Sequence, residues 1–256
     1  MKNNSTTANP ATQPLESQGS PSRTSRFGAE ADLDGKMEKI VRQTLSDQVY
    51  GDLKELLQAG EMEPGQRFTL RGLAAAIGTS AMPVREAVTR LAAEQALEVL
   101  PNRAIRVPLM TRERFLELRT IRLQLECLAI EAAADKRDDN ELAEIQRHEQ
   151  EFLQARAQPD SRAAVRANKN LHFAIYRSAR MPALLQIIES LWLQIGPVLN
   201  YDLASSAARL SQGEAHLHHR AMVAAIENRD PAAARQALHA DLLSASEYIL
   251  ARELLP

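Results

Sequence analysis

Polar side chains interrupt the apolar faces of three helices that the C-terminal half of the chain predicts. Asn168 and His172 are four residues apart, so they project from one side of a helix, in line with apolar neighbours. His219 and Asp241 interrupt the apolar stripes of two later helices. A carboxylate on a buried face needs a partner. Facing helices of a bundle commonly build metal sites, and histidine nitrogen with carboxylate or amide oxygen suits zinc, nickel or manganese better than calcium.

Other histidines lie near these positions. His239 does not replace Asp241, because residues two apart on a helix point about 200° apart and the apolar stripe contains Asp241. His216 and His218 are either surface histidines or groups that support the ligands. The alternative to a metal is that the polar side chains hydrogen-bond within the core, while the carboxylate pairs with an arginine.

A second group of chemically active residues is a series of arginines in the N-terminal half. The segment from residue 67 to residue 110 contains six arginines and three glutamates, a local charge of +3 in a chain whose net charge is −2. Such a local excess of positive charge is the electrostatic footprint expected of a nucleic-acid-binding surface.

The elements that would position these arginines follow in the order helix, turn, helix, wing. Thr69 is a good N-cap for the first helix, which Gly78 ends. The second helix follows the turn at Ser80 and has Pro83 in its first turn, where a missing N–H costs nothing. Two strands, alternating apolar and polar residues, then flank the turn Pro101-Asn102, with apolar residues Leu97, Val99, Ile105, Val107 and Leu109. This order describes a winged helix-turn-helix and predicts DNA binding.

Residues of this segment also form a recognisable set: Leu73, Gly78, Ser80, Pro83-Val84-Arg85-Glu86-Ala87, Arg90-Leu91, Glu94 and Pro101-Asn102-Arg103. With them, the stretch from Leu45 to Val107 resembles the DNA-binding domain of GntR-family bacterial transcription regulators. In that family arginine usually follows the turn serine and glycine stands at the wing tip, whereas this chain has Ala81 and Ala104.

The resemblance implies a set of DNA contacts. Arg85 lies in the recognition helix, where an arginine donates two hydrogen bonds to guanine in the major groove. Arg71 and Arg90 are expected to hold phosphates, and Arg103 to enter the minor groove. For any one of them the alternative is a solvated surface charge. The expected DNA-binding residues are Arg71, Ser80, Arg85, Arg90, Asn102 and Arg103.

Beyond Thr111 the pattern predicts only helices, at about 112–135, 140–157, 161–179, 182–201, 207–228 and 231–253. From Arg114 to Tyr248 this arrangement resembles the FCD-type effector domain of the FadR subfamily, in its six-helix, VanR-like branch. Metal-binding members typically supply an aspartate and three histidines. The resemblance places those ligands at Asn168, His172, His219 and Asp241, so two of the four positions carry a different ligand type.

Arg122 and Glu126 correspond to a pair that is common in this subfamily. A surface salt bridge is one interpretation of residues four apart on a helix. In the other, Arg122 faces the cavity and, with an open metal position, binds the carboxylate of a small organic acid.

The predicted fold is mainly α, with three parts. Residues 1–36, rich in Ser, Thr, Asn, Gln and Pro, form a disordered tail. A winged helix-turn-helix domain spans 37–108, its first helix beginning at Thr44 in a capping box with Asp47, and an all-helical ligand-binding and dimerisation domain of six helices spans 111–254.

Composition supports a cytoplasmic protein. Hydrophobic residues make up 45% and charged residues 25% of the chain, as in soluble globular proteins, and the single Cys127 forms no internal disulfide and is expected to be a buried, inert thiol. No apolar run appears long enough to cross a bilayer, and the N-terminus lacks a signal-peptide core.

These observations predict a dimeric, ligand-responsive transcription regulator, with repression favoured over activation. A single recognition helix reads few bases, so two copies are expected on a near-palindromic operator. The protein is not expected to be an enzyme, because no general base stands beside the proposed metal. One alternative is a metal-dependent hydrolase fused to a DNA-binding module; another is an architectural DNA-binding protein without a ligand.

Overall fold

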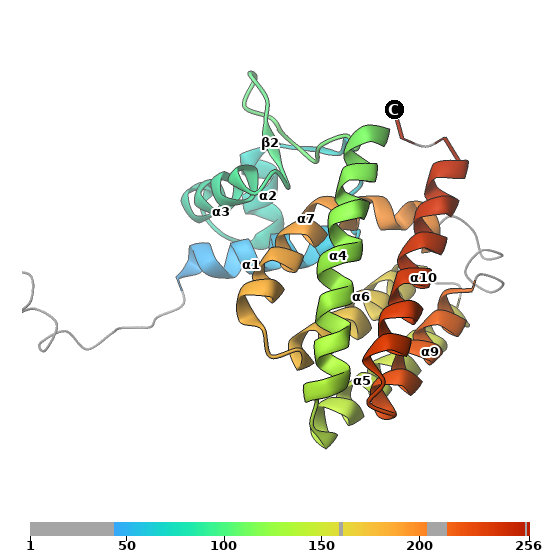
Figure 1. Ribbon diagram of the computed structural model, residues 1–256. Coiled ribbons are helices and arrows are strands. Elements are labelled where there is room, and N and C mark those ends of the chain that lie inside the picture. The colour runs from blue at the N-terminus through green and yellow to red at the C-terminus, as the bar shows by residue number, and fades with distance from the viewer. Residues whose placement is uncertain (1–43, 159–160, 204–213, 254) are drawn as a thin grey trace, which may run out of the picture. The chain divides into compact units, whose positions relative to one another are not determined.

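The computed structural model describes residues 44–158, 161–203, 214–253 and 255–256. The predicted disordered tail and the predicted start of the first domain at residue 37 lie outside the described residues. The segments from residue 44 onward belong to one contact unit, and Figure 1 shows their arrangement.

The N-terminal domain is the predicted winged helix-turn-helix, called the reader below. Its elements in chain order are α1 Leu45–Gln58, β1 Arg67–Phe68, α2 Leu70–Ile77, α3 Ala81–Ala93, β2 Glu98–Val99 and β3 Ile105–Arg106. The capping box of Thr44 with Asp47 is present, as predicted. Thr69 caps α2, and Gly78 ends it in the left-handed conformation that favours glycine.

The wing differs from the prediction in having three strands. β3 pairs antiparallel with β2, as expected, and also with β1, through Arg67 opposite Arg106. A two-residue strand is too short to show alternation, and its partner lies far along the chain, so the sequence pattern did not reveal it. Leu109 was predicted to continue the last strand, but it lies beyond β3 and is exposed.

The core of the reader lies between α1, α2, α3 and the wing. Val49, Leu53 and Leu57 of α1 are buried there, whereas Leu45 and Leu56, which the apolar pattern of the helix also assigns to the core, are exposed. Steps of four residues drift by about 40° each on a helix of 3.6 residues per turn. Leu45, at the helix end, has therefore turned away from the core.

The C-terminal domain contains the six predicted helices, within a few residues of their predicted ends. They are α4 Arg112–Lys136, α5 Asp139–Arg156, α6 Ser161–Ser178, α7 Pro182–Leu203, α9 Ala215–Glu227 and α10 Pro231–Ala251. The predicted start of the fifth helix at residue 207 lies outside the described residues. Capping side chains begin several of them: Thr111 for α4, Asp138 for α5, and Asp230 with Pro231 in the first turn for α10.

The helices enclose one large apolar core. α4 packs along α10, α10 against α9, and α5 against α6 (Figure 1). This core includes the only tryptophan of the chain, Trp192 of α7, with Phe115, Leu118 and Ile130 of α4.

Helix α7 joins the two domains. Trp192 belongs to the core of the bundle, whereas the next residue, Leu193, is buried in the core of the reader. At Gly196 the helices approach so closely that a Cβ atom would lie 2.3 Å from the carbonyl oxygen of Leu57 in α1. By length and composition Pro182–Leu199 qualifies as a membrane span, which the sequence analysis did not expect. Its burial between two cores accounts for its apolar composition.

Charged contacts fix α1 of the reader on the bundle. Lys54 lies 2.6 Å from the carboxylate of Glu189 in α7, and Gln58 donates a hydrogen bond of 3.0 Å to the Glu189 carbonyl. On α6, Arg166 pairs with Glu61 at 2.7 Å, and the buried Lys169 pairs with Glu55. The reader therefore contacts α6 and α7 directly.

Candidate nucleic-acid interface and metal centre

Three of the predicted DNA-binding arginines line one concavity of the reader. Arg71 from the start of α2, Arg85 from α3 and Arg103 from the wing surround a groove of about 750 Å³. All three side chains are exposed. The fold thus brings together guanidinium groups from three separate elements on one face. We call this surface the arginine groove.

The wing tip accommodates the alanine that replaces the usual glycine. Arg103 has the left-handed backbone conformation, with a φ of 63°. The side-chain oxygen of Asn102 accepts a hydrogen bond of 3.1 Å from the Ala104 amide, which closes the turn. Ala104 itself does not have a positive φ. The departure from the family pattern therefore leaves no backbone strain at Ala104.

Ser80 and Arg90 lie outside that groove lining. Ser80 is the N-cap residue of α3 and is exposed, and its side chain makes no capping hydrogen bond. Arg90 donates a hydrogen bond of 2.7 Å to Asp47 and lies 3.9 Å from the ring centre of Tyr50. Hydrogen bonds from Thr44 and Arg90 hold the pKa of the Asp47 carboxyl below its usual value. Arg90 thus connects the recognition helix α3 to α1 through Asp47 and Tyr50.

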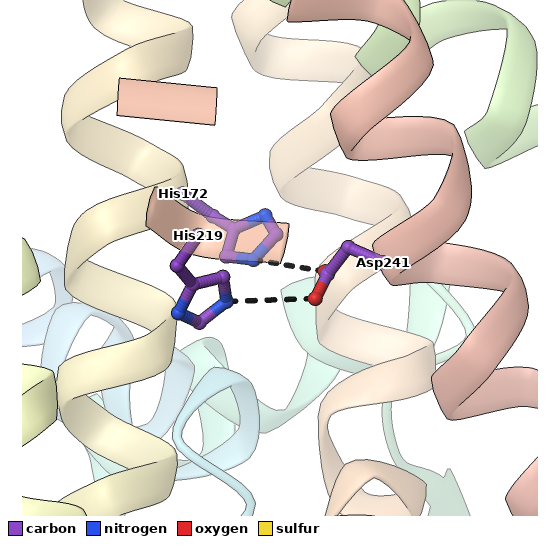
Figure 2. A group of neighbouring side chains, drawn as sticks. All are labelled: His172, His219 and Asp241. Carbon is purple, nitrogen blue, oxygen red and sulfur yellow. Dashed lines mark ion pairs between the residues drawn. The ribbon is translucent and has the colours of Figure 1, made fainter. Parts of the chain in front are cut away.

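The bundle brings together three of the four predicted metal ligands. His172 of α6, His219 of α9 and Asp241 of α10 are buried, with one potential ligand atom from each lying within 4.8 Å of the other two (Figure 2). The Asp241 carboxylate oxygens lie 3.4 Å from Nε2 of His172 and 3.6 Å from Nε2 of His219. His239 is exposed, as the helix geometry predicted.

The fourth predicted ligand, Asn168, lines a cavity that His172 and Asp241 also line, whereas His219 is not part of its lining. Asn168 is 8% exposed and lies one helical turn before His172. The cavity also borders Arg122 and Trp192, and its volume is about 30 Å³. A buried water needs roughly 10–15 Å³ measured in this way, so the cavity has room for a cation or about two waters. We call it the metal chamber.

Hydrogen bonds behind His172 determine which of its nitrogens carries a proton. The Tyr176 hydroxyl lies 2.5 Å from Glu126, and because a carboxylate only accepts, the hydroxyl must donate to it. Its oxygen therefore accepts from Nδ1 of His172, at 2.9 Å. With the proton on Nδ1, a neutral ring has its lone pair on Nε2, which makes no hydrogen bond of standard geometry among the described residues and lies 3.4 Å from the Asp241 carboxylate. The geometry therefore favours a Nε2 lone pair facing the chamber.

His219 presents the same chemistry from α9. It is completely buried, and burial lowers the pKa of its imidazole to about 3, so the ring is neutral at physiological pH. Neither of its nitrogens has a hydrogen-bond partner in the part of the chain that the structure describes. Burial alone would raise the pKa of Asp241, but the adjoining His172 and His219 hold it below its usual value. An ionised carboxylate therefore lies beside the neutral His219 imidazole.

This donor set fits a transition-metal cation. Two imidazole nitrogens converge on the Asp241 carboxylate at 3.4 and 3.6 Å, yet neither makes a hydrogen bond of standard geometry within the described part of the chain, and buried polar atoms without such bonds are costly. A hydrogen bond that orients the far nitrogen of a ligating histidine is a regular feature of metal sites. The core-hydrogen-bond alternative does not account for these atoms, because no arginine pairs with Asp241 in the described structure.

Arg122 faces the chamber, but its guanidinium already has a partner. It pairs with Glu126 through bonds of 2.5 and 3.2 Å, and lies 5.0 Å from the Trp192 ring centre. Trp192 also donates to Glu126, at 3.2 Å. The interpretation as a surface salt bridge is therefore wrong in one respect, because the Arg122–Glu126 pair is buried. Tyr176 and Trp192 were not predicted as site residues. The four-residue spacing of Tyr176 from His172 indicates that both lie on one helix face, and it could have identified Tyr176.

Comparison with known proteins agrees with both halves of the structure. Residues 45–107 match the family described as bacterial regulatory proteins, gntR family, and residues 117–244 match the FCD domain. A winged reader fused to an FCD bundle defines a class of bacterial transcription regulators.

Individual relatives narrow this assignment. The chain is 34% identical over 205 residues to the HTH-type transcriptional regulator McbR of Escherichia coli K12, covering 80% of this chain and 90% of McbR. The solved structure of E. coli McbR/YncC superposes with a TM-score of 0.77 at 31% identity, covering 82% of this chain and 98% of that one. A protein of Paenarthrobacter nicotinovorans, described as a probable D-xylose utilization operon transcriptional repressor, is 28% identical over 80% of this chain and 89% of its own length. The chain belongs to the GntR family and is a DNA-binding transcription regulator rather than an enzyme.

Proposed function

We propose that this regulator binds a near-palindromic operator as a homodimer in the cytoplasm, and that a divalent transition metal in the bundle stabilises one arrangement of its readers. The observation that carries the metal proposal is the set of unpartnered buried nitrogens around Asp241. Operator binding is assigned to the arginine groove, because its guanidinium groups are exposed, unlike those of the bundle core.

His172, His219 and Asp241 would hold the cation, with Asn168 as the fourth ligand. Zinc, nickel and manganese suit this mixture of nitrogen and oxygen donors. When bound, the cation would neutralise the Asp241 carboxylate and satisfy the imidazole lone pairs. Stability would then rise with metal concentration, because binding to the folded state alone shifts the unfolding equilibrium.

Metal analysis of purified protein tests this proposal. The protein should contain about one first-row transition metal ion per chain, lose it to a chelator with a lower melting temperature, and regain both on titration with zinc, nickel or manganese. The His239→Ala variant controls for surface histidines and should behave as wild type. No bound metal, together with no thermal shift on adding any of the three, would eliminate the proposal.

DNA selection tests the reader. Oligonucleotides recovered from a random pool by the purified protein should share two related half-sites, as a two-fold dimer requires. The selection should be repeated with the metal removed. A pool that stays random at moderate salt in both conditions would contradict specific operator binding.

A small organic acid remains the effector that we propose, with Arg122 as its anchor. For this the guanidinium must exchange Glu126 for the incoming carboxylate, and the chamber, at about 30 Å³, must widen to admit the acid. Repression relieved by the acid is the expected response, and one relative is described as a probable transcriptional repressor. Calorimetry with acetate tests the assignment: wild-type affinity in Arg122→Ala would refute it.

A further inference from the structure

A second cavity lies at the joint between the reader and the bundle. Its volume is about 310 Å³. Its walls come from the end of α3, the strand β2, the connecting segment that leads into α4, and the face of α7 that carries Gln194. We call it the joint cavity.

The walls combine apolar surface with two charged side chains, Arg114 and Glu98, and the Glu98 carboxylate pairs with Arg106 at 2.7 Å. Apolar residues provide most of the lining, including Leu97, Met110 and Leu193, and the exposed Leu109 lies at its border. Arg114 of α4 also lines it. Its guanidinium nitrogen Nη2 donates hydrogen bonds to the side-chain amide oxygens of Gln95 and Gln194, at 2.9 and 2.8 Å. The other terminal nitrogen pairs with Glu117 at 2.7 Å. A carboxylate that replaced the two amide oxygens would make stronger hydrogen bonds to Arg114, because charge-assisted hydrogen bonds are stronger than those to neutral acceptors.

The backbone at Gln95 has the left-handed conformation that Arg180, Arg229 and Glu253 also adopt after other helices of the chain. Gln95 follows the C-cap of α3 and has a left-handed φ of 59°. Glycine is the usual residue at this position of a helix, because a side chain there is strained. Here a glutamine occupies it, and its side-chain oxygen accepts from Arg114. Strained residues of this kind cluster at ligand-binding and switch regions.

Volume separates the two cavities. Sites that bind small molecules typically begin at about 300 Å³; the joint cavity reaches that size, whereas the metal chamber, at about 30 Å³, does not. We infer that the joint cavity is a binding site for a small amphipathic monocarboxylate, with the carboxylate on Arg114 and an unbranched apolar chain against the walls.

Such a ligand would contact the recognition helix itself. Ala92 belongs to the last turn of α3, and Gln95 follows the C-cap of that helix. Leu193 and Gln194 belong to α7, which also carries Trp192 beside the metal chamber. A molecule filling the cavity would therefore favour one orientation of the reader over others. The effect of the ligand on DNA binding rests on the proposed function. Binding of the ligand in the joint cavity does not depend on it.

Calorimetry of the full-length protein with octanoate tests the site. We expect one octanoate per chain, at least tenfold weaker binding of uncharged 1-octanol, and no binding of acetate to this cavity. Arg114→Gln should reduce octanoate affinity at least tenfold, to the level of octanol. Ala92→Phe should abolish binding by filling the cavity, whereas Ala93→Phe, an exposed neighbour on the same helix, should bind as wild type.

Two results would overturn the inference. One is the absence of octanoate binding at millimolar concentration, and the other is full binding in Ala92→Phe when its circular dichroism shows a folded protein. Chelation of the metal distinguishes the two cavities: octanoate binding should survive it, and loss of binding with the metal would place the acid in the metal chamber instead. Metal content and operator affinity are measured separately, so failure of the carboxylate site leaves the proposed function standing.

Discussion

The arginine groove and the metal chamber differ in how water reaches their charged groups. The guanidinium groups of Arg71, Arg85 and Arg103 are exposed to water, so they need no protein partner while DNA is absent. His172, His219 and Asp241 are buried, where an unsatisfied polar atom is costly. The comparison teaches that a solvated site needs no ligand to satisfy its charges, whereas the buried site leaves imidazole nitrogens without hydrogen bonds from the described residues unless it holds the cation that we propose.

Removing the carboxylate of the chamber should produce the largest effect. In Asp241→Ala the cation loses its only anionic ligand among the described side chains around it. We expect metal affinity to fall more than hundredfold, beyond the roughly 10–100-fold that loss of an outer hydrogen bond causes. Competition with a chromophoric chelator measures this change. Unaltered affinity would mean that the chamber resembles the groove and needs no cation.

Removing the recognition-helix arginine should have the next largest effect. Arg85→Ala is expected to weaken operator binding by about 1–3 kcal/mol and to flatten discrimination at the base it reads. Folding should be unaffected, because the side chain is exposed. Fluorescence anisotropy on operator and random DNA measures both, with Arg147→Ala of α5 as the control. An equal loss on random DNA would show that Arg85 contacts only phosphate.

The tyrosine behind His172 should have a smaller effect on metal affinity than Asp241. Tyr176→Phe removes the acceptor for Nδ1 of His172, so the proton is no longer directed away from the chamber. We expect about tenfold weaker metal binding, at the lower end of the range for orienting groups, because Trp192 still packs near the His172 ring. The same chelator competition applies. Wild-type affinity would show that packing alone orients the ring.

Cys127 should show no reactivity, and so provides a control for burial without a ligand. Burial raises the pKa of its thiol to about 11, so at pH 8 only about one molecule in a thousand carries the reactive thiolate. Alkylation by iodoacetamide should therefore be negligible in native protein and complete after denaturation, as mass spectrometry would show. Rapid native labelling would mean that the bundle core opens readily.

The fold of the reader could be predicted almost completely, because neighbouring residues in the sequence determine where its helices begin and end. Thr69, Gly78 and Pro83 fix the ends of two helices through their own conformational preferences, and the structure confirms each. Strand β1 was missed because two residues carry no periodicity, and its pairing with β3 depends on contacts far along the chain.

The chamber was predictable only in part. The four-residue step and the apolar stripes placed Asn168, His172, His219 and Asp241 on interior faces, where the structure has them. The stripes did not show that Tyr176 and Glu126 complete a hydrogen-bonded chain behind His172. That chain joins residues 50 positions apart, and local sequence carries no distance between them.

By itself the sequence determined the helices, the caps, the winged motif and the inward direction of the ligands, because each depends on the preferences of neighbouring residues. Only the tertiary structure decided that Arg122 is held by Glu126, that the chamber admits little more than a cation, and that α7 contributes to both cores. These outcomes depend on how helices pack, since distance, burial and volume arise between elements and belong to none of them alone.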